Sequence, residues 1–411
     1  MKRTFKTCDL ILSFAGIRIF SKTKWNSTIW LFFQIICFII GTLAMIFTTG
    51  FIVINVSETV VLLKGASIWS TCIILSISLA ILLFYKTRFR DFLLQMAFKD
   101  FILEMPLVKL SLKSQEIGTK LYELKLLVLE SRDNLLKFTR TLMGTYALIV
   151  FFNSNLYLFD AIYRMIVRED ADERLFAYDM WFPWSTDDWK SYIPTFIFHA
   201  HAGFLCSIAF PGLQVPIALL VRELLRQMRI LSFILMNLDQ LVLENVNDRG
   251  NWQTQCTNIL NQCVVHYIKL KSFSNQLNVI CRPFYLTLIL DSIIVVCMCS
   301  VKIAISDKFA VDTVKYYALG LSFIVIVFAF CLLGQMVQNE CNNLENAVDE
   351  KWYIYNEKHK THLIIFKMAL GHGMTTYIFG TIPLSLPTFT WSAYHLLFIS
   401  FFISMVSDHP V

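Results

Sequence analysis

Four polar side chains near the end of the sequence could line a path for water or ions. Ser400, Ser404, Ser407 and Asp408 lie in an otherwise apolar segment that is rich in Phe, Ile and Leu. On a helix these positions fall at i, i+4, i+7 and i+8, which is one face. Hydroxyl groups can replace part of the hydration shell of an ion, and a carboxylate raises the local concentration of cations. The spacing therefore predicts a pore-lining face in the last membrane span.

A second group of side chains could bind a small molecule. Its members are aromatic residues and small or polar residues in the outer halves of several predicted spans. The candidates are Trp69, Thr71, Phe151, Ser154, Tyr157, Leu158, Phe198, His199, Ala202, Tyr316, Tyr317 and Gly320. Small-molecule pockets are mostly apolar with few polar groups, as this set is. Aromatic residues near a membrane interface also form anchoring belts, so both interpretations stay open.

Three titratable residues add further candidates. His199 and His201 have an i, i+2 spacing, which points their rings in roughly opposite directions on a helix. We therefore expect no metal pair, and either ring could face a pocket or make structural hydrogen bonds. Asp291 lies in the middle of a predicted span, where a charge marks a functional site or a hydrogen-bonded group in the bundle interior. The sequence has no phosphate loop, zinc spacing or catalytic triad, so we predict neither an enzyme nor a cofactor.

Membrane-spanning helices must position these residues. Hydrophobic residues make up 56% of the 411 residues and charged residues only 16%, whereas soluble domains have about 25% charged residues. A span needs about 20 mostly apolar residues. The segments that meet this condition are roughly residues 30–55, 67–85, 141–163, 192–221, 283–303, 314–336 and 374–406. We predict an all-α membrane protein with seven transmembrane helices in one domain over residues 1–411. Pro383 and Pro387 should break the last span.

Basic residues predict the orientation of these spans. Lys and Arg concentrate in the N-terminal segment and in the second, fourth and sixth connections between spans. Such residues mark the cytoplasmic side of a membrane. We therefore expect a cytoplasmic N-terminus and an extracellular C-terminus. The net charge of +6 reflects this asymmetry, so we expect membrane lipid as a partner and no nucleic acid.

The long cytoplasmic connections are predicted to be helical. Residues 86–138, 222–280 and 337–373 are apolar sequences interleaved with charges. This pattern is typical of amphipathic helices, which would extend the spans below the membrane. The resulting intracellular helical layer could hold subunits together or pack only within its own chain, and both alternatives stay open.

Three motifs in the last part of the chain resemble the insect odorant receptors. The first is the run from Phe330 to Gly334, Phe-Cys-Leu-Leu-Gly. The second is Ala347 followed by Trp352, with Val348 in place of the usual tyrosine. The third is the run from Gly380 to Phe389, Gly-Thr-Ile-Pro-Leu-Ser-Leu-Pro-Thr-Phe. Length, span count and inverted orientation fit the same family across the whole chain.

The resemblance implies a ligand-gated, non-selective cation channel in the perception of smell. The chain resembles an odorant-tuning subunit, because its second cytoplasmic connection lacks the long insertion of the common co-receptor. It would form a heterotetramer with that co-receptor in the plasma membrane of an olfactory sensory neuron dendrite. A volatile odorant would bind among the outer halves of spans two, three, four and six. The last helix would line the pore, with Ser400, Ser404 and Asp408 on the pore-facing side.

Two alternatives are less consistent with the sequence. A gustatory receptor channel of the same superfamily would carry a Gln-Phe pair beyond Thr376-Tyr377, and none follows. A G-protein-coupled receptor would need an external N-terminus and usually has Asp-Arg-Tyr at the end of the third span, which is absent here. A transporter would be expected to show internal repeats, which the sequence also lacks.

Overall fold

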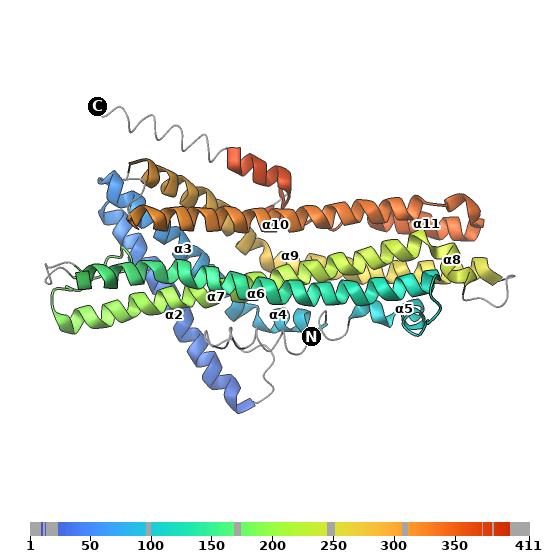
Figure 1. Ribbon diagram of the computed structural model, residues 1–411, viewed down its shortest axis with the longest axis horizontal. Coiled ribbons are helices and arrows are strands. Elements are labelled where there is room, and N and C mark those ends of the chain that lie inside the picture. The colour runs from blue at the N-terminus through green and yellow to red at the C-terminus, as the bar shows by residue number, and fades with distance from the viewer. Residues whose placement is uncertain are drawn as a thin grey trace.

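Long helices packed side by side dominate the structure (Figure 1). The computed structural model describes residues 10, 13, 24–95, 100–167, 174–244, 251–305, 311–371, 373–379 and 382–394. The helices are α2 (Lys24–Ile54), α3 (Thr59–Phe84), α4 (Lys86–Leu94), η2 (Phe101–Glu104), α5 (Pro106–Ser111), α6 (Lys120–Val167), α7 (Trp189–Met236), α8 (Leu238–Leu243), α9 (Trp252–Ile305), α10 (Val311–Asp349), η4 (Trp352–Ile354) and α11 (Glu357–Leu370). A terminal helix covers residues 386–394. The predicted all-helical fold class is confirmed, with one small hairpin that was not expected.

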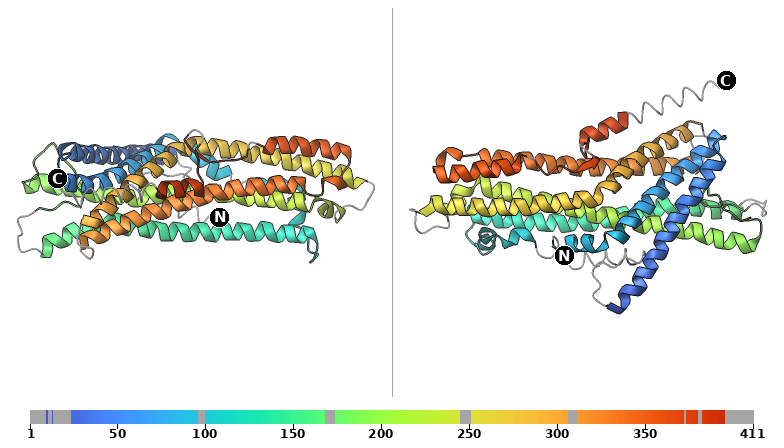
Figure 2. Two further views of the ribbon diagram at one scale, coloured as in Figure 1. Left: turned by 90° about the horizontal axis from the view of Figure 1, so that it is seen from above. Right: turned by 180° about the vertical axis from the view of Figure 1, so that it is seen from behind.

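The longest helices exceed the thickness of a membrane. Helices α6 and α7 have 48 residues each and α9 has 54, which gives lengths of about 72 and 81 Å at 1.5 Å per residue. The hydrocarbon core of a bilayer is about 30 Å thick. Their apolar stretches lie at the end of the bundle near α2 and α3, and their charged stretches lie toward α5, α8 and α11 (Figures 1 and 2). One end of the bundle therefore fits a membrane, and the other end projects from it.

Among the described residues, six helices are long and apolar enough to cross a membrane. They are Thr28–Ile54, Gly65–Phe84, Lys120–Val167, Trp189–Met236, Trp252–Ile303 and Thr313–Ile354. The chain is therefore a multi-pass membrane protein. The predicted last span ends on residues outside the described part of the chain, and so do the predicted pore-lining residues Ser400, Ser404, Ser407 and Asp408.

Helix α7 lies at the centre of the bundle. It contacts α2, α3, α6, α9 and α10, and most of its side chains are buried. It also contains Pro194, Pro211 and Pro216. A proline inside a helix leaves the carbonyl four residues earlier without its N–H donor, here those of Ser207 and Gly212 for the last two prolines. Helix α7 remains continuous because tertiary packing supplies most of the stability of a helix.

A buried network of charges joins α7 to the chain before η2 and to α9. Arg226 Nη2 donates to Asp100 Oδ1 at 2.5 Å, and Arg226 Nε donates to Glu223 Oε2 at 2.8 Å. Gln227 Nε2 donates to Glu223 Oε1 at 2.8 Å, and Gln227 Oε1 lies 3.0 Å from His266 Nε2. All five side chains are buried. Asp100 has a φ of 40°, a conformation that persists in a non-glycine residue when its surroundings hold it.

A small hairpin precedes the terminal helix. Strand β1 (Tyr377–Phe379) pairs antiparallel with β2 (Ile382–Pro383). The terminal helix then begins at residue 386, where the Phe389 N–H donates to the Ser385 carbonyl at 3.1 Å. The predicted last span started at residue 374, but residues 374–379 and 382–385 are not helical. Pro383 lies in β2 and Pro387 lies in the first turn of the helix, where the missing N–H would have no partner within the helix.

Helix α10 holds this junction by close contact. A Cβ atom at Gly334 would overlap the backbone carbonyl of Leu384, so only glycine fits there. The rings of Phe328 and Phe389 pack edge to face, with centroids 5.3 Å apart. Two of the sequence motifs therefore meet in space, because one supplies the glycine and the other supplies the segment that crosses it.

Candidate ligand-binding cavity

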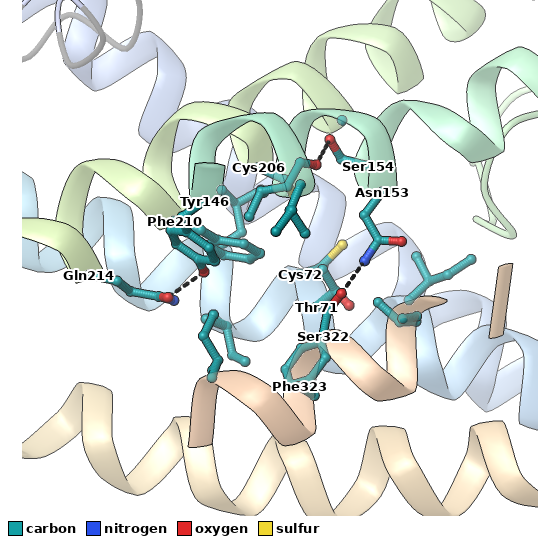
Figure 3. A pocket seen from close by; sticks show the side chains of 18 of the residues that line it. Thr71, Cys72, Tyr146, Asn153, Ser154, Cys206, Phe210, Gln214, Ser322 and Phe323 are labelled. Atoms are coloured by element: carbon teal, nitrogen blue, oxygen red, sulfur yellow. Dashed lines mark hydrogen bonds between the residues drawn. The ribbon is translucent and has the colours of Figure 1, made fainter. Parts of the chain in front are cut away.

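A cavity of about 330 Å³ lies among α3, α6, α7 and α10 (Figure 3). Helix α9 adds Leu288 to its wall, and the loop between α6 and α7 adds Tyr178 and Met180. Most of the lining side chains are aliphatic or aromatic, with few polar groups among them. A cavity of this size and composition is typical of a small-molecule site.

Four of the predicted binding residues line this cavity. They are Thr71, Ser154, Tyr157 and Ala202. The predicted residues that do not line it are Trp69, Phe151, Leu158, Phe198, His199, Tyr316, Tyr317 and Gly320. The structure therefore brings together one predicted residue each from α3 and α7 and two from α6. A role in ligand binding stays a prediction for all of them.

Helical phase explains which residues of α6 reach the cavity. Tyr146, Val150, Asn153 and Tyr157 line it, and their spacing of three or four residues follows one helical face. Phe151 follows Val150 directly and points away from this face, with 39% of its surface exposed. Aromatic character alone was therefore a weaker signal than periodicity.

The same rule applies to α7 and shows what the sequence interpretation missed. Ala202, Cys206, Phe210 and Gln214 line the cavity at every fourth residue. The sequence interpretation considered only the outer halves of the spans, so it included Ala202 and omitted the deeper positions. Continuing the helical face of Ala202 in steps of four residues reaches Gln214, and the same extension on α6 reaches Tyr146.

His199 supports the loop between α6 and α7. Its side chain is fully buried, and its Nδ1 accepts a hydrogen bond of 3.2 Å from the Tyr178 backbone N–H. The ring stacks with those of Phe176 and Tyr178, at centroid distances of 5.0 and 5.7 Å. These contacts correspond to the structural hydrogen bonding that the sequence left open for His199.

Tyr178 forms part of the cavity wall from this loop. Its hydroxyl donates to the Ser154 backbone carbonyl at 2.6 Å. A Cβ atom on Gly203 would overlap that hydroxyl, so α7 needs glycine where the tyrosine crosses it. The Trp181 backbone N–H donates to the Phe47 backbone carbonyl at 3.0 Å. This hydrogen bond connects the loop to α2. Loop residues have no helical periodicity, so the sequence carried no signal for Tyr178.

Polar side chains of the wall are paired with one another (Figure 3). Asn153 Nδ2 donates to Ser322 Oγ at 2.8 Å, and the Tyr146 hydroxyl donates to Gln214 Oε1. Such a wall can bind a neutral molecule by apolar burial and orient it with single hydrogen bonds. Within the described residues no cluster of side chains is suited to hold a metal ion.

Two titratable candidates lie away from this wall. Asp291 of α9 is only 4% exposed and does not line the cavity. Its Oδ2 atom has no hydrogen-bond partner among the described residues. His201 of α7 is partly buried and also lies outside the lining. Neither residue therefore belongs to the candidate ligand-binding cavity.

This sequence and its fold are similar to those of known proteins. The model of the family described as 7tm Odorant receptor matches residues 58–393. The fold is similar to the insect olfactory receptor OR5 from Machilis hrabei in complex with eugenol, with a TM-score of 0.79, 12% identity, and coverage of 99% of this chain and 98% of that one. A second structure of that receptor gives a TM-score of 0.76 at 12% identity, with coverage of 98% and 97%. Comparison with curated protein sequences gave no match. The chain belongs to the 7tm odorant receptor family.

Proposed function

We propose that this chain is an odorant-tuning subunit that, with the common co-receptor, opens a non-selective cation channel when a volatile odorant binds. The observation that carries the proposal is the mostly apolar cavity of about 330 Å³ among α3, α6, α7 and α10. Membership of the odorant receptor family supports an odorant as its ligand. The similar receptor from Machilis hrabei has been solved in complex with eugenol.

Binding energy would come mainly from burial of the odorant. Removing apolar surface from water contributes about 25 cal/mol per Å², and the cavity wall consists mostly of aliphatic and aromatic side chains. Thr71, Ser154, Tyr157 and Ala202 are the predicted ligand contacts that this cavity includes. A neutral molecule suits the wall, because an unpaired charge in such surroundings would be strongly destabilised.

Helix α10 connects the cavity mechanically to the segment that leads into the proposed pore. Phe323 and Ile326 line the cavity, and further along the same helix Phe328 packs on Phe389 and Gly334 accommodates the Leu384 carbonyl. A ligand changes the open population only if it binds the open state more tightly than the closed state. A shift of α10 on binding would supply such a difference, because it would move the junction that leads into the terminal helix.

The pore and the assembly complete the proposal. Ser400, Ser404, Ser407 and Asp408 would line the pore, with Asp408 at its outer mouth attracting cations. The N-terminus would be cytoplasmic and the C-terminus extracellular, because basic residues favour the cytoplasmic side. The projecting ends of the long helices would form an intracellular layer that holds a heterotetramer with the co-receptor. The complex would reside in the plasma membrane of an olfactory sensory neuron dendrite.

A matched pair of variants tests the cavity. Val150 lines the cavity, whereas Leu148 lies outside the lining and is 59% exposed. Each is replaced by tryptophan and expressed with an insect co-receptor, and currents are recorded over an odorant panel. Val150→Trp should reduce the potency of active odorants by about five-fold or more, since overpacking a site costs about 1–3 kcal/mol. Leu148→Trp should leave potency unchanged, and equal effects of the two variants would remove the cavity from odorant binding.

A separate variant tests the pore. Asp408→Lys places a positive charge where we propose the outer mouth, so cation conductance should fall or divalent permeability should change. The measurement is the reversal potential and single-channel conductance of the co-receptor complex. Unchanged permeation would mean that Asp408 lies away from the ion path, and absence of co-receptor-dependent current in the wild type despite surface delivery would refute the channel itself.

A further inference from the structure

Gln214 has a buried side-chain amide, and only its oxygen atom makes a hydrogen bond among the described residues. It lies on α7 in the wall of the cavity, with 4% of its surface exposed. Its Oε1 atom accepts the hydrogen bond from the Tyr146 hydroxyl of α6. Figure 3 shows this pair beside Phe210, apart from the pair formed by Asn153 and Ser322. The two pairs thus define two separate polar points along one apolar wall.

The other half of the Gln214 amide faces the cavity. Its Nε2 atom donates to no group in the described part of the chain. Unlike the unpaired polar atoms that the protein encloses completely, this atom keeps some accessible surface. Asn153 shows the contrast, because its Nδ2 donates to Ser322 and its unpaired Oδ1 is completely enclosed. Among these amides, Gln214 therefore presents N–H donors to a molecule in the cavity.

An unpaired N–H donor inside a membrane protein is costly. Neither lipid nor an apolar wall can accept its hydrogen bond, so the group loses its hydration without compensation. An oxygen atom of a bound molecule would restore the missing bond. A net hydrogen bond of this kind changes affinity roughly three- to ten-fold, which is enough to separate ligands of equal size.

The cavity also favours an elongated molecule. On α7 it extends from Ala202 to Gln214, and on α6 from Leu142 to Tyr157. The stretch on α7 corresponds to about 18 Å along the helix axis at 1.5 Å per residue. Gln214 lies at one end of this stretch, and Tyr178 lies against Gly203 at the other. A ligand that reaches the amide would therefore lie along the helices with its oxygen at the Gln214 end.

We propose that Gln214 determines specificity by donating a hydrogen bond to an acceptor oxygen at one end of an elongated, otherwise apolar ligand. The ligand class is therefore neutral molecules with a terminal carbonyl, ether or hydroxyl oxygen. This inference rests on the proposed function of the cavity as the odorant site. Tyr146 acts as a positioning residue, because its hydroxyl holds Oε1 and turns Nε2 toward the cavity.

Four probes of equal heavy-atom count test the inference: nonane, octanal, methyl heptyl ether and octanol. Each is applied to the full-length chain expressed with an insect co-receptor, and potency is taken from the current. The wild type should prefer the three oxygenated probes to nonane. Gln214→Leu should reduce this preference roughly three- to ten-fold while the response to nonane persists. Comparing ratios between variants cancels differences in how the probes partition into the membrane.

Two further variants separate recognition from folding. Tyr146→Phe keeps the Gln214 amide but frees Oε1, so the amide can turn and accept a hydrogen bond from a hydroxyl, and octanol should gain against octanal and the ether. A merely structural role would weaken all probes alike. Gln276→Leu is the control, because Gln276 is exposed on α9 and outside the cavity lining. Its probe ratios should equal those of the wild type.

Thermal stabilisation of the purified full-length chain by each probe measures binding separately from current. It therefore distinguishes failure of the Gln214 proposal from failure of the proposed channel function. Stabilisation without current would refute the proposed channel function and leave the Gln214 site standing. Equal probe ratios in Gln214→Leu and the wild type would overturn the Gln214 site and leave the channel standing. A wild-type preference for octanol over both octanal and the ether would overturn the donor role of the amide. Failure of every probe to stabilise the wild-type chain would exclude the ligand class.

Discussion

Replacing Arg226 with methionine should destabilise the protein far more than the same change three residues later. Arg226 is the only cation that contacts the buried carboxylates of Asp100 and Glu223 within the described network. The side chains of all three residues are only 3% exposed. Arg226→Met leaves two carboxylates in the interior without a cation, although Gln227 still donates to Glu223.

The magnitude follows from this burial. Breaking a buried ion pair by removing one partner costs about 3–5 kcal/mol, because the remaining charge is desolvated and unpaired. Arg229 provides the control, since its Nε also contacts a carboxylate, that of Glu340, at 2.5 Å, but its own side chain is 50% exposed; that of Glu340 is 11% exposed and also accepts a hydrogen bond from Asn343 Nδ2. An ion pair whose cation is open to solvent is screened and contributes about 1 kcal/mol or less. Arg226→Met should therefore exceed Arg229→Met by at least about 2 kcal/mol in its effect on stability.

The assay is thermal unfolding of the purified full-length chain, followed by tryptophan fluorescence. Arg226→Met should lower the transition temperature clearly, and Arg229→Met should shift it little. Adding Glu223→Gln and Asp100→Asn to Arg226→Met removes the buried charges and should recover most of the loss, because neutral side chains have a smaller desolvation cost. Equal shifts in the two single variants, or no recovery in the triple variant, would show that the network does not stabilise the fold in this way.

Two further predictions concern close packing and pH. Gly334→Ala should strongly reduce surface delivery and thermal stability, because its Cβ would overlap the Leu384 carbonyl. Gly144→Ala should be tolerated, since a Cβ atom added there would meet no heavy atom within 4 Å. Similar expression of the two variants would contradict the overlap. Burial lowers the pKa of His359 in α11 from 6.5 to about 4. The unfolded chain therefore binds the proton first, and stability should fall as the pH falls from 6.5 toward 4. His359→Phe should reduce the slope of that part of the stability profile, and an unchanged pH dependence would assign it to other groups.

The sequence predicted the helical architecture well because length and hydropathy are local properties. Spans of about 20 apolar residues could be found without knowing their neighbours. The hairpin at Tyr377–Phe379 was missed because its short strands are as apolar as the span in which they lie. Pro383 indicated a break in that segment, but pairing between β1 and β2 depends on contacts of β1 with α9 that hydropathy does not encode.

The candidate site was predictable only in part. Ala202 and Ser154 could be chosen because small or polar residues on an apolar helix are unusual, and helical phase then placed them in the cavity wall. Gln214 was missed because the depth of a cavity depends on how closely helices pack, which a single sequence does not state. Tyr178 was missed because its position depends on the fold of a loop that is fixed by His199 and Ser154.

The prolines of α7 have a mechanical consequence. The bending stiffness of a helix depends on its backbone hydrogen bonds, and Pro211 and Pro216 each remove one of these bonds. Both gaps fall in the stretch that carries Phe210 and Gln214 to the cavity. The most deeply packed helix is thus most compliant where it would meet a ligand. A ligand of unusual shape would be accommodated there by a small bend of one helix backbone. The range of shapes that the proposed site accepts would then depend on two proline rings that need not touch the ligand.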